Sequence, residues 1–170
     1  MPTDQSSNTL QTMSLRDARK LVLISQGIHR EKDLGKGMLA SHNAIEELSY
    51  LQIDTISVVE RAHHHTLWNR VNSYDASQLD ELVKTKHIFE YWSHAAAFLP
   101  MRDFRYSLPR KNAIAAGERH WYSKDKKATQ HVLDRIKSDG PLQSKDFKQS
   151  TISREGWGDW KPAKRALEQL

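Results

Sequence analysis

Gln52 and Asp54 stand two residues apart in the apolar run from Leu51 to Val58. Two is the repeat of an extended chain, so both side chains would leave the backbone on the same face. An amide can donate to and accept from one water molecule, and a nearby carboxylate can polarise that water and take its proton. The pair therefore fits a hydrolytic site, although the same spacing also occurs in ordinary sheets, where both side chains usually face solvent.

The segment that must position this pair, residues 51–58, is short and rich in β-branched residues. This pattern favours a strand, with a loop into another helix as the main alternative. Ser14 is a candidate N-cap for a helix that ends near Gly27. Helical spacing of apolar residues indicates further helices at 38–48 and after Asp75. The aromatic and apolar run over 87–100 could supply a strand and the packing between the two halves of the chain.

The C-terminal third has the pattern of a helix-turn-helix. We expect a helix over 127–137, a break at Asp139-Gly140-Pro141, a short helix capped by Ser144, and a final helix over 161–170 with Pro162 in its first turn. Helix, turn, helix, loop, helix is the core of a winged helix-turn-helix domain, but the β-hairpin wing that should follow is absent. We therefore expect this sequence to be the N-terminal part of a longer protein, with packing of the final helix against another partner as the alternative.

These elements predict a mainly α fold with small β elements, arranged as tandem winged helix-turn-helix domains. The expected organisation is a disordered leader over 1–13, an N-terminal winged-helix-like domain with the Gln52 and Asp54 pair over 14–100, and a linker helix with an incomplete second winged-helix domain over 101–170.

Composition narrows the function classes. The chain has no cysteine, which excludes disulfides, thiolate zinc sites and a cysteine nucleophile. No apolar stretch approaches the length that spans a bilayer, and no secretory signal is visible, so we expect a cytoplasmic protein without a membrane partner. Gly35 and Gly37 mark a turn and not a phosphate-binding loop, and no cofactor is expected.

The net charge of +5 is concentrated in one stretch, since residues 102–137 hold ten Lys or Arg against four Asp or Glu. The same stretch carries Phe104, Tyr106, Trp121 and Tyr122. Basic and aromatic side chains together are typical of a surface that contacts phosphates and stacks on bases. The alternative is a solvated helical face.

Three consecutive histidines, His63, His64 and His65, follow the pair. Only His63 and His65 could share a face, and then only in an extended segment, and the four-residue spacing of zinc hydrolases is missing, so we expect no metal site. Local packing is the usual role of such histidines, and phosphate contact is the functional alternative. The candidate DNA contacts are Arg61, His63, His64, His65, Arg70, His94, Arg102, Arg105, Arg110 and Lys111.

Several ordered motifs carry a resemblance to a known family. Gln52-Ile53-Asp54 is followed by the His-rich stretch 59–71, and later by Phe89-Glu90-Tyr91-Trp92-Ser93-His94-Ala95-Ala96, Leu99-Pro100, Gly140-Pro141-Leu142 and Trp160-Lys161. Together they span nearly everything after Met13. This series resembles the bacterial winged-helix DNA glycosylases of the AlkZ and YcaQ type.

The resemblance implies tandem winged helices and removal of alkylated bases from double-stranded DNA in base excision repair, including unhooking of interstrand crosslinks through guanine N7. Gln-aliphatic-Asp is the pattern of the YcaQ branch, with Asp54 as the electrostatic and general-base group and Gln52 as the residue that positions water. Many relatives carry His-Glu-Ala where this chain has His94-Ala95-Ala96, which puts the substrate range in doubt, and family members are considerably longer.

The expected enzyme is a monofunctional glycosylase with no obligate protein partner, since no lysine stands beside the pair to form a Schiff base. A fragment of such an enzyme need not be active by itself. The alternatives are a non-catalytic winged-helix DNA-binding module or regulator, and a scaffold that binds partners without DNA. Asp54 discriminates the enzyme from the first alternative, and the salt dependence of DNA binding tests the second.

Overall fold

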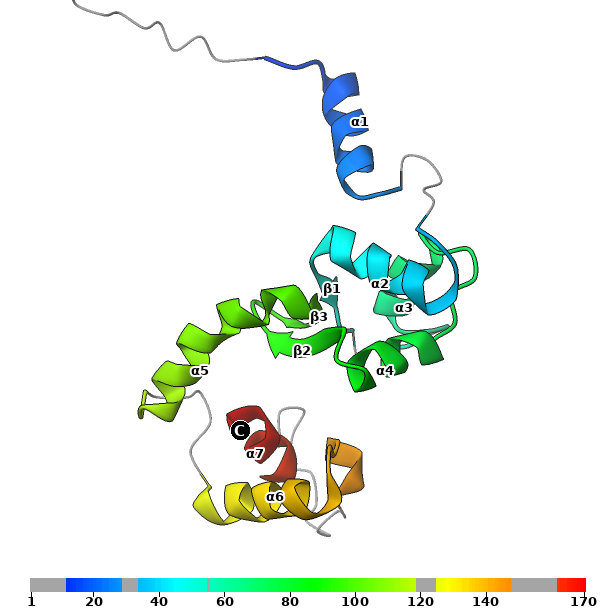
Figure 1. The fold of residues 1–170 in the computed structure, drawn as a ribbon. Helices are drawn as coiled ribbons and strands as arrows, with labels where there is room; N and C mark the ends of the chain where they lie inside the picture. Colours follow the sequence, from blue (N-terminus) through cyan, green and yellow to red (C-terminus); the bar gives the residue numbers. More distant parts are fainter. Residues whose placement is uncertain (1–11, 29–33, 55, 119–124, 148–161) are drawn as a thin grey trace, which may run out of the picture. The chain divides into compact units, whose positions relative to one another are not determined.

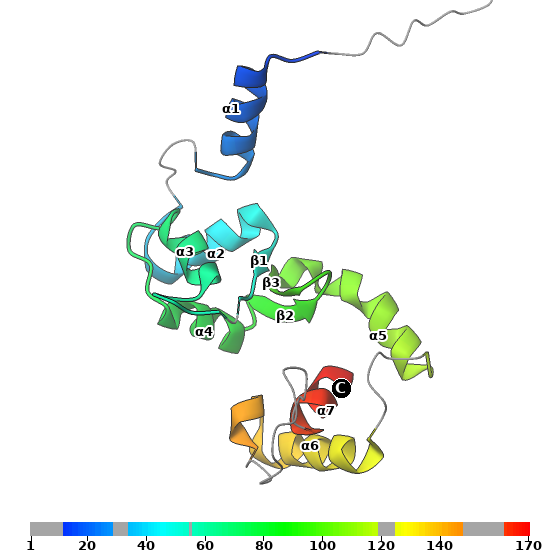
Figure 2. The same cartoon turned by 180° about the vertical axis from the view of Figure 1, so that it is seen from behind.

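The computed structural model describes residues 12–28, 34–54, 56–118, 125–147 and 162–170. These residues form seven α-helices, two short 3-10 helices and one three-stranded sheet (Figure 1, Figure 2). The predicted mainly helical class with small β elements is confirmed, and the winged helix-turn-helix arrangement stays a prediction. None of the described helices is both long and apolar enough to cross a membrane.

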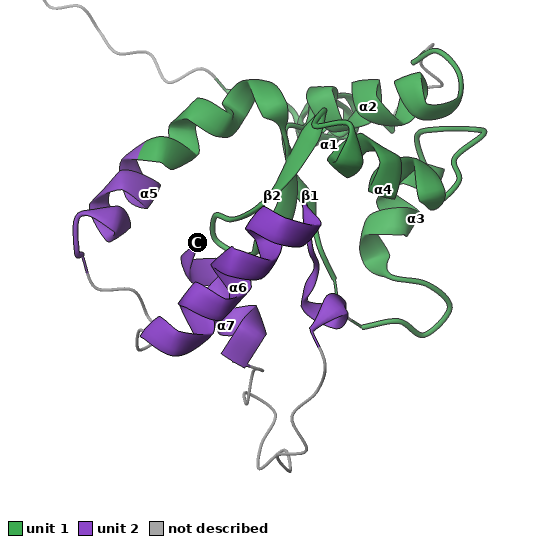
Figure 3. Cartoon of the chain, turned by 60° about the horizontal axis from the view of Figure 1, so that its bottom comes forward, with its two compact units in different colours: residues 1–108 green, residues 109–170 purple. Residues whose placement is uncertain are grey.

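The chain divides into two compact units, residues 1–108 and 109–170 (Figure 3). The first holds α1 (Leu15–Ser25), α2 (Gly37–Leu48), β1 (Leu51–Gln52), α3 (Ala62–Trp68), α4 (Ser77–Lys84), β2 (Ile88–Trp92), β3 (Ala96–Pro100) and η1 (Met101–Ser107). The second holds nearly all of α5 (Leu108–Ala115), followed by α6 (Lys126–Asp139), η2 (Ser144–Asp146) and α7 (Pro162–Gln169).

Side-chain caps explain where several helices begin. Ser14 Oγ accepts a hydrogen bond from the Asp17 backbone N–H at 3.1 Å, which confirms the predicted start of α1. Asp125 caps α6 in the same way, through the Ala128 N–H. The predicted helices at α2, α4, α6 and α7 are confirmed as well. The cap expected at Ser144 is wrong, because Gln143 forms a capping box with Asp146 and Ser144 is already inside η2.

The sheet is antiparallel, with the strand order β1-β3-β2. The aromatic run within 87–100 forms two strands, β2 and β3, that pair from Ile88 with Pro100 to Trp92 with Ala96. β1 adds only two residues to the outer edge of β3, so the strand predicted over 51–58 is too long. A loop and then the helix α3 follow β1, as the alternative interpretation of this segment predicted.

The core of the first unit lies where α2, α3 and α4 meet the sheet (Figure 1). Ile45 and Leu67 are completely buried in it, and Leu51 brings the start of β1 into the same cluster. The remaining members are Ala40, Ala44, Val71, Tyr74, Leu79, Leu82 and Ile88. β1 is therefore anchored to the core of this unit through Leu51.

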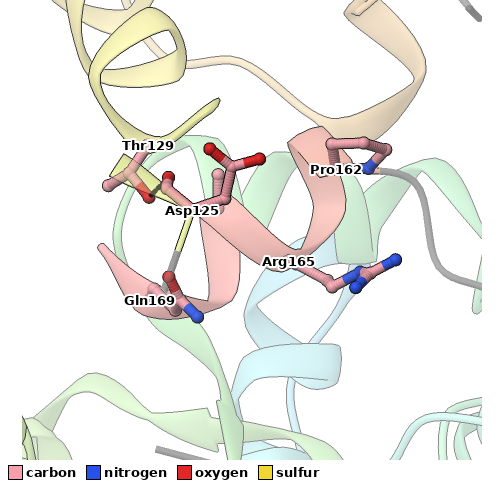
Figure 4. A pocket seen from close by; sticks show the side chains of 6 residues that line it. Asp125, Thr129, Pro162, Arg165 and Gln169 are labelled. Atoms are coloured by element: carbon pink, nitrogen blue, oxygen red, sulfur yellow. Dashed lines mark hydrogen bonds between the residues drawn. The ribbon is translucent and has the colours of Figure 1, made fainter. Parts of the chain in front are cut away.

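The second unit has a smaller core, in which Val132, Phe147 and Ala166 are buried. A shallow pocket lies between the start of α6 and α7, and Figure 4 shows the side chains that line it. Asp125, Thr129 and Arg165 are among its lining residues, but Asp125 already caps α6 and the Thr129 hydroxyl already donates to the Asp125 carbonyl. The predicted turn around Trp157 and Trp160 lies outside the described residues.

Candidate active site

The pair predicted to do chemistry lies at the point where β1 leaves the sheet. Leu51 pairs with Phe98 and Gln52 with Ala97, and the Ile53 N–H then donates to the Ala96 carbonyl at 2.8 Å. Leu51 is buried and Gln52 is exposed, as the alternation of an extended chain requires. The core therefore fixes the strand from one side and leaves the Gln52 amide on the other.

Asp54 ends the strand through its own carboxylate. Asp54 Oδ1 accepts a hydrogen bond from the Ile56 N–H at 2.8 Å, the pattern of an Asx turn, directly after Ile53, whose N–H is still bonded to β3. No described residue donates a hydrogen bond to the other oxygen, Oδ2. The half-buried carboxylate thus has one oxygen that sets the turn and one that can receive a proton from a ligand or water.

His63 holds the backbone of Asp54. Its Nδ1 accepts the Asp54 backbone N–H at 3.2 Å, and only 4% of the residue is exposed. Burial, followed by the charges of His64 and Arg61, lowers the pKa of His63 from 6.5 to about 4. The imidazole is therefore neutral near pH 7, with its proton on Nε2 and the Nδ1 lone pair directed at the strand end. Sequence reasoning found this residue but not this role.

The three histidines lie in a helix, α3. They do not lie in the extended segment that His63 and His65 would need in order to share a face. Successive side chains on a helix diverge by about 100°, so His63 and His65 do not share a face. His64 Nδ1 and the Tyr74 hydroxyl are 2.6 Å apart, and His65 Nε2 lies 3.2 Å from the Glu60 carbonyl. Burial raises the pKa of Tyr74, so this hydroxyl stays protonated and can donate to His64.

Residues 56–61 lead from the turn at Asp54 to α3, and we call them the closed loop because a backbone bridge closes them. Ser57 and Arg61 form an isolated antiparallel bridge, and Glu60 accepts the Arg61 N–H at 2.8 Å through Oε1. That hydrogen bond is the main reason why the pKa of Glu60 lies below its ordinary value. Val58 and Val59 at the tip of this loop are 92% and 86% exposed. The β-branched residues up to Val58 were the reason to predict a strand over 51–58, and the structure has an exposed loop there instead.

Two of the arginines predicted to contact DNA hold protein backbone. Arg70 donates through Nε and Nη2 to the Gln26 carbonyl at 3.0 and 2.7 Å, and through Nη1 to the Thr66 carbonyl at 2.8 Å. Arg102 donates to the Glu46 carbonyl and to Ser49 Oγ, and it forms an ion pair with the Glu46 carboxylate. These contacts link α3 to the end of α1 and η1 to the end of α2.

The other predicted DNA contacts are spread over both units. Arg61 is exposed at the end of the closed loop, and His94 lies in the turn between β2 and β3, where its ring stacks on Tyr50 at 4.8 Å. Arg105 is exposed beside Tyr106. Arg110 pairs with Glu118 at 2.6 Å in the second unit, where Lys111 is also exposed.

The basic stretch over 102–137 is likewise divided between the units, and its residues Trp121 and Tyr122 lie outside the described part of the chain. The structure thus brings Gln52, Asp54 and His63 to one strand end, and it distributes the basic residues over several elements of both units.

The arrangement at the strand end suits activation of water. The turn holds the Asp54 carboxylate through Oδ1, and the neutral His63 imidazole holds the Asp54 backbone N–H, so the second carboxylate oxygen stays available. The exposed Gln52 amide can orient a water molecule. The described residues contain no group of three His, Asp or Glu side chains spaced to hold a metal ion.

Comparison with known protein families gives an independent result. The family described as DNA glycosylase AlkZ-like matches residues 45–170, which is well over half of the chain and includes β1, the closed loop, α3 and the β2–β3 hairpin. No solved structure matches the chain. The match confirms the resemblance to the AlkZ and YcaQ type at the level of the family, and the YcaQ branch stays a prediction. The chain belongs to the AlkZ-like DNA glycosylase family.

Proposed function

We propose that the chain is the catalytic part of a monofunctional DNA glycosylase of the YcaQ branch, which hydrolyses the N-glycosidic bond of N7-alkylated purines, including those in interstrand crosslinks. The observation that carries the proposal is the anchoring of Asp54. Its backbone N–H and one carboxylate oxygen are fixed by His63 and Ile56, at the exposed end of a strand that also presents Gln52.

The chemistry of an N7-alkylated purine fits this small set of groups. Such a base carries positive charge, so it departs without a strong general acid, and the demand falls on stabilising the cationic sugar. A fixed carboxylate beside the anomeric carbon supplies that stabilisation and can take a proton from the attacking water. Asp54 has this role in the proposal, and Gln52 orients the water.

The absence of nearby lysines favours hydrolysis over a covalent route. Between Lys36 and Lys84 the sequence contains no lysine, so β1, the closed loop and α3 offer no amine to form a Schiff base with the sugar. Borohydride added during turnover should therefore trap no covalent complex with DNA. A trapped complex would contradict the monofunctional assignment.

The decisive experiment replaces the carboxylate in the full-length protein. Asp54→Asn should lower single-turnover release of N7-methylguanine by about 100-fold or more, because both charge and basicity are lost, while DNA affinity stays nearly unchanged. Gln52→Ala should cost about tenfold or more through poorer placement of water. Asp80→Asn, at an exposed position on α4, is the matched control.

The outcome also separates the enzyme from a non-catalytic DNA-binding module. Wild-type turnover in Asp54→Asn would reject the catalytic role of this residue. Binding of DNA without any base release by the wild-type protein would favour the module. Binding to DNA that does not weaken as salt is raised would count against phosphate contacts altogether.

A further inference from the structure

The closed loop after Asp54 exposes aliphatic side chains at the edge of the candidate active site. Ile56 is 70% exposed, Val58 92% and Val59 86%, so these side chains pack on almost nothing within the protein. Exposed aliphatic residues are common singly, but three within four positions are a feature that a folded protein usually covers or uses.

Hydrogen bonds hold the backbone of the closed loop in place, although the side chains at its tip are exposed. The bridge between Ser57 and Arg61 closes it, the Glu60 carboxylate accepts the Arg61 N–H, and His65 reaches the Glu60 carbonyl from α3. The two valines therefore project from a loop whose ends are tied to a helix. Such a tip can enter a partner without first being ordered, which lowers the entropic cost of binding.

The position of the loop identifies the kind of partner. The Ile56 N–H is hydrogen-bonded to Asp54 Oδ1, and Val58 comes only two residues later. A chain of four residues spans at most about 14 Å, so the valines must act within a few nucleotides of any sugar that Asp54 approaches. Arg61 adds an exposed cation at the end of the loop. An apolar tip beside a cation suits a nucleic acid, in which phosphates lie next to an apolar base stack.

Resting on the proposed function, we propose that Val58 and Val59 form an apolar wedge that enters the base stack beside the damaged nucleotide. Proteins that bend or open DNA insert aliphatic side chains between base steps in this way, and the unstacking frees a nucleotide for chemistry. The wedge would open the duplex on one side of the lesion while Asp54 faces its sugar. Arg61 would hold the adjacent phosphate.

The test compares two substrates and two surface variants of the full-length protein. Both substrates carry N7-methylguanine next to 2-aminopurine, one in a perfect duplex and the other in an unpaired bubble where the bases are already unstacked. The test variant is Val58→Ser with Val59→Ser. Val22→Ser, on the exposed face of α1, is the control because it removes the same side chain from a helix away from the loop.

We expect the double variant to release the base from the duplex at least about tenfold more slowly than the wild type, since it must unstack a base step without the wedge. On the bubble, the two proteins should be nearly equal, and Val22→Ser should match the wild type on both substrates. The wild type should also raise 2-aminopurine fluorescence when it binds the duplex, and the double variant should not.

The failures are distinguishable. Equal rates of wild type and double variant on the duplex would overturn the wedge while leaving the glycosylase assignment intact. An equal loss on duplex and bubble would also overturn it and would point to a role in holding the protein together or in binding another protein. If the wild type released no base at all, the proposed function would fail, and the fluorescence change alone would then decide whether the loop opens DNA.

Discussion

The closed loop and helix α3 reverse the usual division between polar and apolar residues. Val58 is 92% exposed, whereas His63, five residues later, is 4% exposed and hydrogen-bonded to the backbone of Asp54. A sequence optimised for stability alone would place the valine inside and the histidine outside. Both regions follow Asp54 closely in the sequence, and we infer that the exposed apolar tip and the buried imidazole are both kept for function.

The largest expected effect tests how firmly α3 is anchored. Leu67→Ala should lower the free energy of unfolding by about 2–5 kcal/mol, because Leu67 is completely buried and its removal leaves a cavity. Val58→Ala should change it by less than about 0.5 kcal/mol, because that side chain has little to lose. Urea denaturation of both variants measures the contrast, and similar losses would mean that the loop is packed in solution.

The second prediction concerns pH. In the unfolded chain His63 takes up a proton near pH 6.5, but in the folded protein only near pH 4, because the site is buried. Between these values the unfolded state binds the extra proton, so this contribution is complete above pH 6.5 and is lost as the pH falls towards 4. It amounts to at most about 3 kcal/mol.

Urea midpoints of the wild type and of His63→Asn across pH 4–8 isolate this contribution, because the variant lacks the titrating group. A pH dependence that is unchanged in His63→Asn would show that other groups account for it.

A pair of substitutions at His63 separates its hydrogen bond from its bulk. His63→Leu removes the acceptor and leaves the Asp54 N–H unsatisfied, which should cost about 1–3 kcal/mol. His63→Asn can place its Oδ1 near the position of Nδ1 and should recover part of that loss, together with part of the rate of base release. If Leu and Asn behaved alike in both measurements, the imidazole would be packing and not positioning Asp54.

The smallest prediction concerns His64, which is only partly buried. Tyr74→Phe deletes the hydroxyl that lies 2.6 Å from His64 Nδ1 and should cost about 1 kcal/mol of folding stability. Tyr106→Phe is the control, since Tyr106 is 67% exposed and should show almost no change. If the urea midpoints of Tyr74→Phe and Tyr106→Phe did not differ measurably, the contact between Tyr74 and His64 would not stabilise the fold.

Local signals were enough to predict most helices of this molecule. Ser14 and Pro162 mark the starts of α1 and α7, and apolar spacing located α2, α4 and α6. Each of these signals acts within a few residues of its own element. The β1 strand was predicted too long because its end depends on a hydrogen bond from Ile56 to Asp54, which the β-branched composition of residues 51–58 does not reveal.

The sequence predicts which side chains could do chemistry, and that role stays a prediction. It does not predict the contacts that hold those side chains in place. Residue types and spacing were enough to choose Gln52 and Asp54, and the family match covers both. The role of His63 could not be predicted, because its partner is a backbone N–H nine residues away, and backbone groups carry no sequence signature. Likewise, nothing in the residue types indicates that Arg70 and Arg102 contact carbonyls instead of solvent.

The bridge between Ser57 and Arg61 has a consequence for how this region can evolve. It ties two residues four positions apart, and α3 begins at the next residue, Ala62. Deleting or inserting one residue between them would rotate every later α3 position by about 100°, which would carry the imidazole away from the strand end. The helix that follows therefore fixes the length of the tip, independently of which side chains the tip carries.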